Sequence, residues 1–571
     1  MSHDTEPTLT EHEEQKTPAA KPVLLALCAV FIFYLILAAF GLPQKWANAQ
    51  LAPSHEEAAV QQADTQTPAA VQKQQAEPKH EEHATGVPPI WMIIPFCALL
   101  LCIAVLPLIP ATEHWWESNL NRFIVAAVLG FFTLGYYAFI CDFPIALHFP
   151  SHAIVNPSQG ALAMGGTIFV NSIINEYIAF IVLLFALFTI SGGIRISGDL
   201  KASPFVNSII MLIGAVLASF VGTTGAAMLM IRLLLETNKE RKFKAHTVIF
   251  FIFCVCNCGG CLLPIGDPPL FLGYLRGVDF LWTFSLWKEW VFVNGITIVV
   301  YFLMDSLWYY RKESKTDKQL DNTARQPLKI RGLFPNVFCL IGVILSVMFL
   351  APGKEICGFN PWMFLREIAQ LLLVAISLLL GSHTIRAENK FNYAAICEVA
   401  ALFFGIFICM QAPLQILNAS GGVISQKADQ IGSKIGLDTP QQFFWMTGSL
   451  SSVLDNAPTY VVFFETARAA EKAKIEELKK DGKKEEAQKL EAELKDAEKA
   501  CGVPIPLHLL AAVSLGAVFM GSMTYIGNGP NFMVKAIAEQ SGVKMPSFFG
   551  YMVYSILILF PILIAMTLIF L

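Results

Sequence analysis

The sequence predicts an all-α polytopic membrane protein built from an inverted repeat, with two re-entrant hairpins and two broken helices. Hydrophobic residues make up 55% of its 571 residues and charged residues 15%, a far more apolar balance than in soluble domains. Apolar runs of about 20 residues, the length that crosses a bilayer, recur along the chain. Polar segments interrupted by Gly and Pro stand inside this apolar sequence in two matching copies.

The two copies align at three places. The matched positions are Glu176 with Glu398, Thr223-Thr224 with Asp455-Asn456, and Gly266-Asp267-Pro268-Pro269 with Gly527-Asn528-Gly529-Pro530. Their offsets are 222, 232 and 261 residues, and the last two differ because a charged segment, residues 467–500, is inserted in the second copy only. Duplicated polar breaks of this kind are typical of secondary transporters whose broken helices face each other across a buried site.

The N-terminal segment, residues 1–49, contains an apolar run that follows Lys16 and Lys21. Residues 47–49 read Ala-Asn-Ala, a pattern that signal peptidase cleaves, so the segment is either a signal peptide or an uncleaved first helix. Both interpretations place residues 50–87 outside the cytoplasm. This segment is rich in Gln, Ala, Glu and Pro and has no aromatic residue, so we expect a disordered linker there.

From residue 88 on, the chain divides into two transport repeats, 88–310 and 333–571, joined by a basic linker, 311–332. Two crossings, near 247–275 and 505–537, are interrupted by Gly and Pro. A helix that ended in lipid would leave backbone groups unpaired, so the polar residues in the middle of 203–235 and 440–466 predict re-entrant hairpins with buried tips. Uninterrupted apolar runs occur at 90–110, 123–141, 167–190, 280–304, 333–351, 362–380, 393–417 and 547–571.

The basic residues predict the orientation, because short cytoplasmic loops retain Lys and Arg. They cluster in 232–244 and 311–331, whereas the 142–165 loop has none. The first hairpin then enters from the cytoplasm and the second from outside, so the two copies are inverted. The inserted 467–500 segment lies outside, where its apolar spacing predicts two amphipathic helices that turn near Asp481-Gly482 and form a solvated hairpin.

Four carboxylates lie within apolar sequence: Glu176, Asp267, Glu398 and Asp455. A charge inside a membrane is costly, so each is a candidate for function. A partly desolvated carboxylate near neutral pH can hold either a proton or a metal ion but not both, and this competition would couple the two movements.

Asp267 stands between Gly266 and two prolines, where a helix cannot continue and carbonyl oxygens become available to a hard cation. Its alternative role is structural, as the cap of the half-helix that begins at the prolines. Asp455 is similar, with Asn456 beside it as a neutral oxygen ligand. The other candidate ligands are the hydroxyl and amide groups of Thr223, Thr224, Asn257, Asn528 and Asn531.

Glu176 and Glu398 lie in otherwise unbroken apolar helices. They are either proton-relay groups or partners in an ion pair or hydrogen bond that ties a scaffold to a moving part. Four cysteines between Cys254 and Cys261 have a helical spacing unlike that of the zinc-binding knuckle, so we expect structural thiols and no metal site.

Two motifs resemble those of the ion-transporter superfamily: NCGGCLLPIGDPP at Asn257 to Pro269 and LDNAP at Leu454 to Pro458. The superfamily includes NhaD-type sodium/proton antiporters, arsenite carriers, citrate–metal symporters and divalent-anion/sodium symporters. Over about residues 88–571 the chain is especially similar to proteins described as sodium:proton antiporters or as CitMHS-like citrate transporters. The resemblance implies an elevator-type transporter, in which hairpins and broken helices move against a scaffold that often forms a homodimer.

The chain departs from that pattern in two places. The antiporters usually carry an Asp-Asn pair in the first hairpin as well, where this chain has Thr223-Thr224. The Ser-Asn-Thr motifs of dicarboxylate carriers are absent from both hairpin tips.

The leading hypothesis is a sodium (or lithium)/proton antiporter, because the centre offers carboxylates rather than Arg or Lys. The alternative is a cation-coupled symporter of citrate or another carboxylate, held by half-helix N-termini. A remote alternative is the proton-channel subunit of a membrane complex. No enzyme motif and no basic groove for nucleic acid is found in the sequence, and no cofactor is expected besides the transported Na⁺ and H⁺. We expect a multi-pass protein of the bacterial inner (plasma) membrane.

Overall fold

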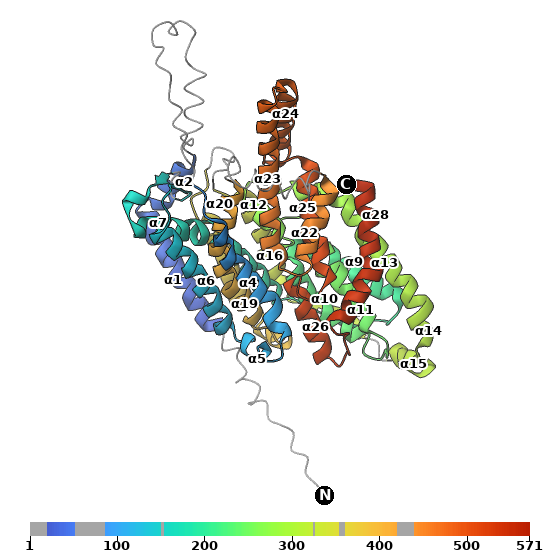
Figure 1. The fold of residues 1–571 in the computed structure, drawn as a ribbon. Coiled ribbons are helices and arrows are strands. Elements are labelled where there is room, and N and C mark those ends of the chain that lie inside the picture. Colours follow the sequence, from blue (N-terminus) through green and yellow to red (C-terminus); the bar gives the residue numbers. More distant parts are fainter. Residues whose placement is uncertain (1–19, 52–85, 150–152, 324–325, 353–359, 419–438) are drawn as a thin grey trace, which may run out of the picture.

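The structure is a computed structural model that describes residues 20–51, 86–149, 153–323, 326–352, 360–418 and 439–571. Most of the predicted 50–87 linker lies outside the described residues. The described part is mostly helical, which confirms the all-α class, and seven of its helices are long and apolar enough to cross a membrane. Figure 1 shows the helices packed side by side between two ends, one carrying α5 and α15 and the other carrying α24.

The elements before the basic linker are α1 (Ala20–Ala39), α2 (Leu42–Leu51), η1 (Ile90–Ile93), α4 (Ile94–Val105), η2 (Leu106–Leu108), α5 (Glu113–Trp116), α6 (Asn119–Phe139), β1 (Ile145–Leu147), β2 (Ala153–Val155), η3 (Pro157–Gln159), α7 (Ala161–Phe169), η4 (Val170–Tyr177), α8 (Ile178–Ser191), β3 (Arg195–Asp199), α9 (Pro204–Val221), α10 (Thr223–Thr237), α11 (Ala245–Val255), η5 (Cys258–Cys261), α12 (Pro268–Leu275), η6 (Trp282–Leu286), α13 (Trp287–Met304) and η7 (Asp305–Tyr309).

The remaining elements are α14 (Tyr310–Lys312), α15 (Lys315–Thr323), β4 (Gln326–Arg331), α16 (Leu333–Phe349), α17 (Leu365–Leu380), α18 (His383–Glu388), α19 (Ala394–Cys409), α20 (Gln411–Asn418), α22 (Pro440–Ser451), α23 (Asn456–Lys480), α24 (Lys484–Cys501), α25 (Leu507–Met520), η8 (Gly521–Met523), α26 (Gly529–Gln540), α27 (Phe548–Tyr554), η9 (Ser555–Leu559) and α28 (Phe560–Phe570).

The N-terminal α1 packs on α17, and the Tyr34 hydroxyl donates a hydrogen bond to the carbonyl of Met363 at 3.1 Å. The Ala-Asn-Ala pattern lies within α2, where Ala47 is buried. Both helices are part of the described structure, and cleavage between them and the linker stays a prediction.

The two predicted hairpins begin with the same capping chemistry. Ser203 caps α9 by accepting a hydrogen bond from the N–H of Val206, and Thr439 caps α22 through a capping box with Gln442. A proline follows each cap at the first helical position, where its missing N–H leaves no broken bond. Each of these helices then stops near the middle of the molecule, α9 at Val221 and α22 at Ser451, and a second helix leads back out.

Close helix packing depends on glycines at two contacts. A Cβ atom on Gly405 of α19 would lie 2.4 Å from the carbonyl oxygen of Ala126 on α6. A Cβ atom on Gly516 of α25 would lie 2.6 Å from the carbonyl oxygen of Phe444 on α22. Small residues that let helix backbones approach this closely are typical of membrane helix packing.

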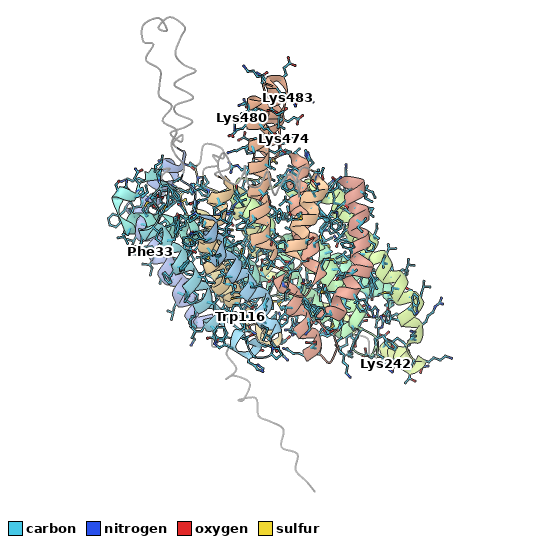
Figure 2. The ribbon with its side chains drawn as sticks, viewed as in Figure 1. Phe33, Trp116, Lys242, Lys474, Lys480 and Lys483 are labelled. Carbon is cyan, nitrogen blue, oxygen red and sulfur yellow. The ribbon has the colours of Figure 1, made fainter. Side chains whose placement is uncertain are left out.

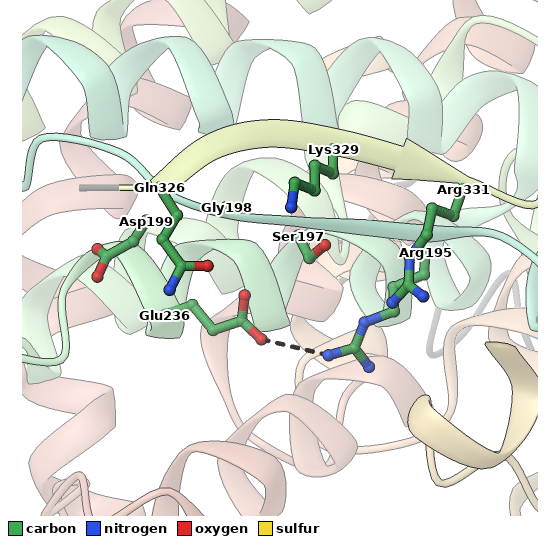
Figure 3. A pocket seen from close by; sticks show the side chains of 8 residues that line it. All are labelled: Arg195, Ser197, Gly198, Asp199, Glu236, Gln326, Lys329 and Arg331. Atoms are coloured by element: carbon green, nitrogen blue, oxygen red, sulfur yellow. Dashed lines mark ion pairs between the residues drawn. The ribbon is translucent and has the colours of Figure 1, made fainter. Parts of the chain in front are cut away.

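A short antiparallel sheet pairs β3 with β4, with Arg195 opposite Arg331 and an irregularity between Ser197 and Asp199. It joins the segment before α9 to the basic linker between the repeats. A cleft of about 470 Å³ lies beside this sheet, and Figure 3 shows Lys329 and Gln326 on β4 above it and Glu236 at the end of α10.

The inserted segment forms a helical hairpin that projects from the body of the molecule (Figure 1). Its first helix is the outer part of α23, the chain turns at residues 481–483, and α24 returns. In Figure 2 Lys474, Lys480 and Lys483 mark this hairpin, while Lys242 lies at the opposite end of the molecule.

Candidate functional site

Four helices begin where the apolar segments are broken. They are α10, α12, α23 and α26, which start at Thr223, Pro268, Asn456 and Gly529. Proline stands at the first or second position of α12 and of α26, so these breaks are dictated by the sequence. Hydrogen bonds bring the beginnings of all four helices together.

Asp267 is the centre of this convergence, and only 1% of its surface is exposed. Its Oδ1 accepts hydrogen bonds from the Thr223 hydroxyl at 3.1 Å and the Asn528 amide at 3.2 Å. Its Oδ2 accepts one from the Asn456 amide at 2.8 Å. The three donors belong to three different breaks, so one carboxylate joins both hairpins and both broken helices.

This geometry differs from the alternative that Asp267 caps its own half-helix. Asp267 is the residue before α12, but its side chain makes no capping hydrogen bond. Its carboxylate oxygens are directed across the site instead. The two prolines at the start of α12 have no N–H to donate to a cap, and the N–H of Leu270 after them donates to the backbone carbonyl of Asp267 at 3.1 Å.

Asp455 makes the kind of contact that Asp267 lacks. It stands before α23, and its Oδ1 accepts a hydrogen bond from the backbone N–H of Ala457 at 3.0 Å. The residue is half-buried. No hydrogen bond to its Oδ2 is found among the described residues, so that oxygen is available to a ligand.

A second set of asparagines supports the first. The Asn257 amide donates to Asn531 Oδ1 at 2.7 Å and to the carbonyl of Ile252 at 3.0 Å. The Asn528 amide is 3.3 Å from Asn257 Oδ1, and the Asn531 amide donates to the carbonyls of Gly521 and Thr524. These bonds satisfy the carbonyls that a broken helix exposes and tie the two breaks together.

Seven of the eight predicted ion-binding residues are thus brought to one place: Thr223, Asn257, Asp267, Asp455, Asn456, Asn528 and Asn531. The eighth, Thr224, is half-buried next to Thr223, and no side-chain hydrogen bond joins it to the network among the described residues. The role of all eight residues in binding an ion stays a prediction.

The glycines that shape the site were not among the predicted site residues. A Cβ atom on Gly260 would lie 2.6 Å from Thr223 Cγ2, and one on Gly266 would lie 2.2 Å from the carbonyl oxygen of Gly260. In the second copy, a Cβ atom on Gly527 would lie 2.6 Å from the carbonyl oxygen of Gly521. Because Gly266 and Gly527 occupy matching positions of the two copies, the duplication itself was the signal that could have identified them.

The site combines a buried carboxyl group with neutral partners. Each side chain that bonds to Asp267 is a hydroxyl or an amide. The N-termini of four half-helices, each with a partial positive charge of roughly half a unit, compensate the carboxylate. Hydroxyl and amide oxygens can also ligate a hard cation, and an amide presents its oxygen after rotation by about half a turn.

Glu176 and Glu398 lie apart from this network. Glu176 Oε2 is 3.1 Å from Arg276 Nη2, and Glu398 Oε2 is 3.0 Å from Arg122 Nη1. The sequence left open a proton-relay role or an ion pair for these two residues. The structure provides each glutamate with an arginine, as an ion pair requires.

The four cysteines from Cys254 to Cys261 are buried. Among the described residues, no group of three or more His, Cys, Asp or Glu side chains is placed to hold a metal ion. The backbone of this stretch contributes to the site, since the carbonyl of Cys256 accepts a hydrogen bond from the Asn528 amide at 3.0 Å.

Comparison with known proteins adds one match. A sequence model of a protein family described as "Putative citrate transport" matches residues 85–571. No curated protein matches the chain. The matched range contains both hairpins, both broken helices and every residue of the Asp267 network.

Proposed function

This chain belongs to the putative citrate transport family, and we propose that it exchanges sodium or lithium ions for protons. It is a multi-pass membrane protein and a secondary transporter. The observation that supports exchange is Asp267, a buried carboxylate held only by neutral groups from three breaks in the chain. The bacterial inner membrane is its proposed location, and the proposed activity involves no enzymatic step.

The exchange follows from the chemistry of one carboxylate. An ionised Asp267 accepts three hydrogen bonds, whereas a protonated one also carries an O–H donor that needs an acceptor, so the side chains around it must rearrange. A bound sodium ion instead attracts oxygens, so the Asn456 and Asn528 side chains rotate to present Oδ1. A proton on Asp267 removes the negative charge that attracts sodium, so this one carboxyl group cannot hold a proton and a sodium ion together.

Asp455 provides the second carboxylate of the proposed site. Its Oδ1 stays with the cap of α23, and its Oδ2 is available to the ion. A single sodium ion between two carboxylates has more charge compensation than it needs, so one of the two can hold a proton in the sodium-bound form. The stoichiometry then depends on whether both are ionised before sodium enters.

Purified protein in liposomes tests the proposal directly. With a sodium gradient and a pH-sensitive dye inside, we expect sodium-driven proton movement in the wild type and none in Asp267→Asn. The amide preserves the size of the side chain but cannot exchange a proton. Exchange at the wild-type rate in this variant would exclude Asp267 as the coupling group.

The same geometry favours a second candidate, cation-coupled symport of citrate or a related carboxylate. Four half-helix N-termini converge at the centre, and helix N-termini bind anions through their free N–H groups and dipoles. The description of the family points the same way. Uptake of labelled citrate that requires sodium, in the same liposomes, would favour this candidate, and citrate-independent sodium/proton exchange would favour the first.

A further inference from the structure

The helices fall into two groups by their packing. One group, which we call the transport body, contains the elements of the Asp267 network: α9 packs on α10 and α11, α22 on α25, and α23 on α12 and α25. The other group, which we call the scaffold, contains α6, η4, α8, α16, α17 and α19, which pack on one another. The contacts that join the two groups decide how the body is held in position.

Arg276 makes the contact of interest, at the end of the half-helix that begins after Asp267. It is the residue after α12, and its side chain is 9% exposed. Its Nη2 lies 3.1 Å from Glu176 Oε2 in η4 of the scaffold, and its Nε lies 3.6 Å from Glu465 Oε1 on α23 of the transport body. One guanidinium therefore has a carboxylate partner in each group.

The half-helix α12 links this contact to the site. Asp267 stands before its first residue and Arg276 after its last. At 1.5 Å per residue the two lie roughly 13 Å apart along one short rigid helix. A second contact holds the same end, since the Tyr274 hydroxyl donates to the carbonyl of Val347 on α16 at 2.5 Å. Displacement of this end of α12 would displace Asp267 with it.

The neighbouring surface between the two groups is aromatic. Phe180 of α8 stacks on Phe403 of α19, with ring centres 4.8 Å apart, and faces Phe271 of α12 at 6.5 Å. Apolar contacts have little directional preference and tolerate sliding, whereas an ion pair with hydrogen-bond geometry is satisfied in one relative position. The polar contacts of α12 therefore favour the present position of the body on the scaffold, whereas the aromatic contacts do not favour any one position.

The matching residue of the other copy has a different partner. Glu398 pairs with Arg122 at 3.0 Å, and both residues belong to scaffold helices, α19 and α6. The two glutamates are related by the duplication, yet one pair crosses between the groups and the other stays within the scaffold. The Glu398–Arg122 ion pair is therefore a control, because it has the same chemistry but does not join the two groups.

We propose that Glu176 and Arg276 form a latch that holds the transport body against the scaffold in this position and opens in each transport cycle. Removal of one partner from a buried ion pair normally leaves a costly unpaired charge. For Arg276, Glu465 prevents this, because it travels with Arg276 in the transport body and remains its partner when Glu176 is left behind. The latch is a contact that stabilises one state of the transport cycle. It rests on the proposed transport function only in that the transport body must move.

The test measures position rather than transport. The scaffold label is placed at Leu162→Cys on α7, which packs on α6 and η4, and the body label at Lys480→Cys on the projecting hairpin. With the exposed Cys28, Cys97 and Cys397 replaced by Ser, these spin labels report the distance between scaffold and body in nanodiscs. We expect Glu176→Gln to change the ratio of the two distance populations by about tenfold, as for loss of a charge-assisted hydrogen bond. Glu398→Gln should leave the ratio unchanged.

Two results would overturn the latch: an unchanged ratio in Glu176→Gln, or equal changes in Glu176→Gln and Glu398→Gln. If Glu176→Gln does not fold, Arg276→Lys takes its place, and a shift smaller than tenfold is expected, because Lys retains the charge without the guanidinium fork. Failure of the transport proposal has a separate signature. In that case liposomes show no sodium-driven proton movement while the Glu176→Gln shift persists.

Discussion

Asp267 and Asp455 make different contacts at the starts of α12 and α23. Both stand directly before a half-helix, and both could cap it. The prolines after Asp267 have no N–H to donate to a cap, the N–H of Leu270 donates to the backbone of Asp267, and the carboxylate is bonded by Thr223, Asn456 and Asn528. Asp455 is followed by residues with N–H groups and caps α23. Aspartate therefore has two roles here, a contact across the site and a helix cap, and the residues that follow it decide between them.

The first prediction at this scale separates charge from capping at Asp455. Asparagine caps helices as well as aspartate does, so Asp455→Asn should fold with nearly wild-type stability. It cannot release a proton, so sodium-coupled proton movement should be abolished. Thermal unfolding and liposome flux check the two halves, and normal flux in the variant would remove Asp455 from the site.

A second residue-scale prediction concerns Asn456, whose amide donates to Asp267 Oδ2 at 2.8 Å. Asn456→Ala removes that donor and the oxygen that would face a bound ion. We expect apparent sodium affinity to fall by roughly tenfold, as for loss of one hydrogen bond to a charged group. Thr224→Ala is the matched control, because Thr224 lies outside the network, and an equal loss in both variants would contradict the assignment.

At the scale of elements, the breaks were predictable and their partners were not. Gly, Pro and the duplicated polar motifs mark where α9, α12, α22 and α26 must stop or start, because the backbone chemistry is local. The pairing of Arg276 with Glu176 joins residues 100 positions apart, and that of Arg122 with Glu398 joins distant helices. Both glutamates are recognisable in the sequence as proton-relay groups or ion-pair partners, but the choice between these roles depends on a partner that only packing defines.

The projecting hairpin of α23 and α24 gives an element-scale prediction. Its inner face is closed by residues such as Ile475 and Leu494, and the rest is charged and exposed. Replacing residues 472–494 by a short Gly-Ser turn should leave sodium-driven proton flux unchanged, because the part of α23 that starts at Asn456 is retained. Loss of flux with normal expression would show that the hairpin takes part in transport.

The sheet of β3 and β4 is anchored by charge at its edge, which gives a pH-dependent prediction. A hydrogen bond from Arg331 lowers the pKa of Glu388 below its usual value. A carboxyl group whose pKa is lowered by folding stabilises the folded protein at any pH above its unfolded-state pKa. This contribution is lost as the pH falls through its folded-state pKa. Glu388→Gln should therefore lower stability slightly at neutral pH and not in strong acid, because the pair is exposed. Unfolding temperatures of the wild type and Glu388→Gln, measured from neutral pH to strong acid, should differ slightly at neutral pH and become equal in acid.

At the scale of the whole molecule, the orientation predicted from the basic residues assigns the two ends of the structure to opposite sides of the membrane. Lys242 lies at one end and Lys480 at the other (Figure 2). In intact cells, an impermeant maleimide should label Lys480→Cys from outside, whereas Lys242→Cys should be labelled only after lysis. The reverse result would invert the assignment of the ends, and labelling of both in intact cells would contradict a fixed orientation.

The central claim is that sodium and a proton compete for the carboxylates of one buried site. Calorimetric titration of the purified protein with sodium at several pH values, with and without citrate, tests it most directly. Competition with one proton weakens apparent sodium affinity about tenfold per pH unit below the pKa of the shared group, and citrate makes no difference. A sodium affinity that is insensitive to pH, or one that citrate strengthens, would contradict exchange, and in the second case linkage requires sodium to strengthen citrate binding equally.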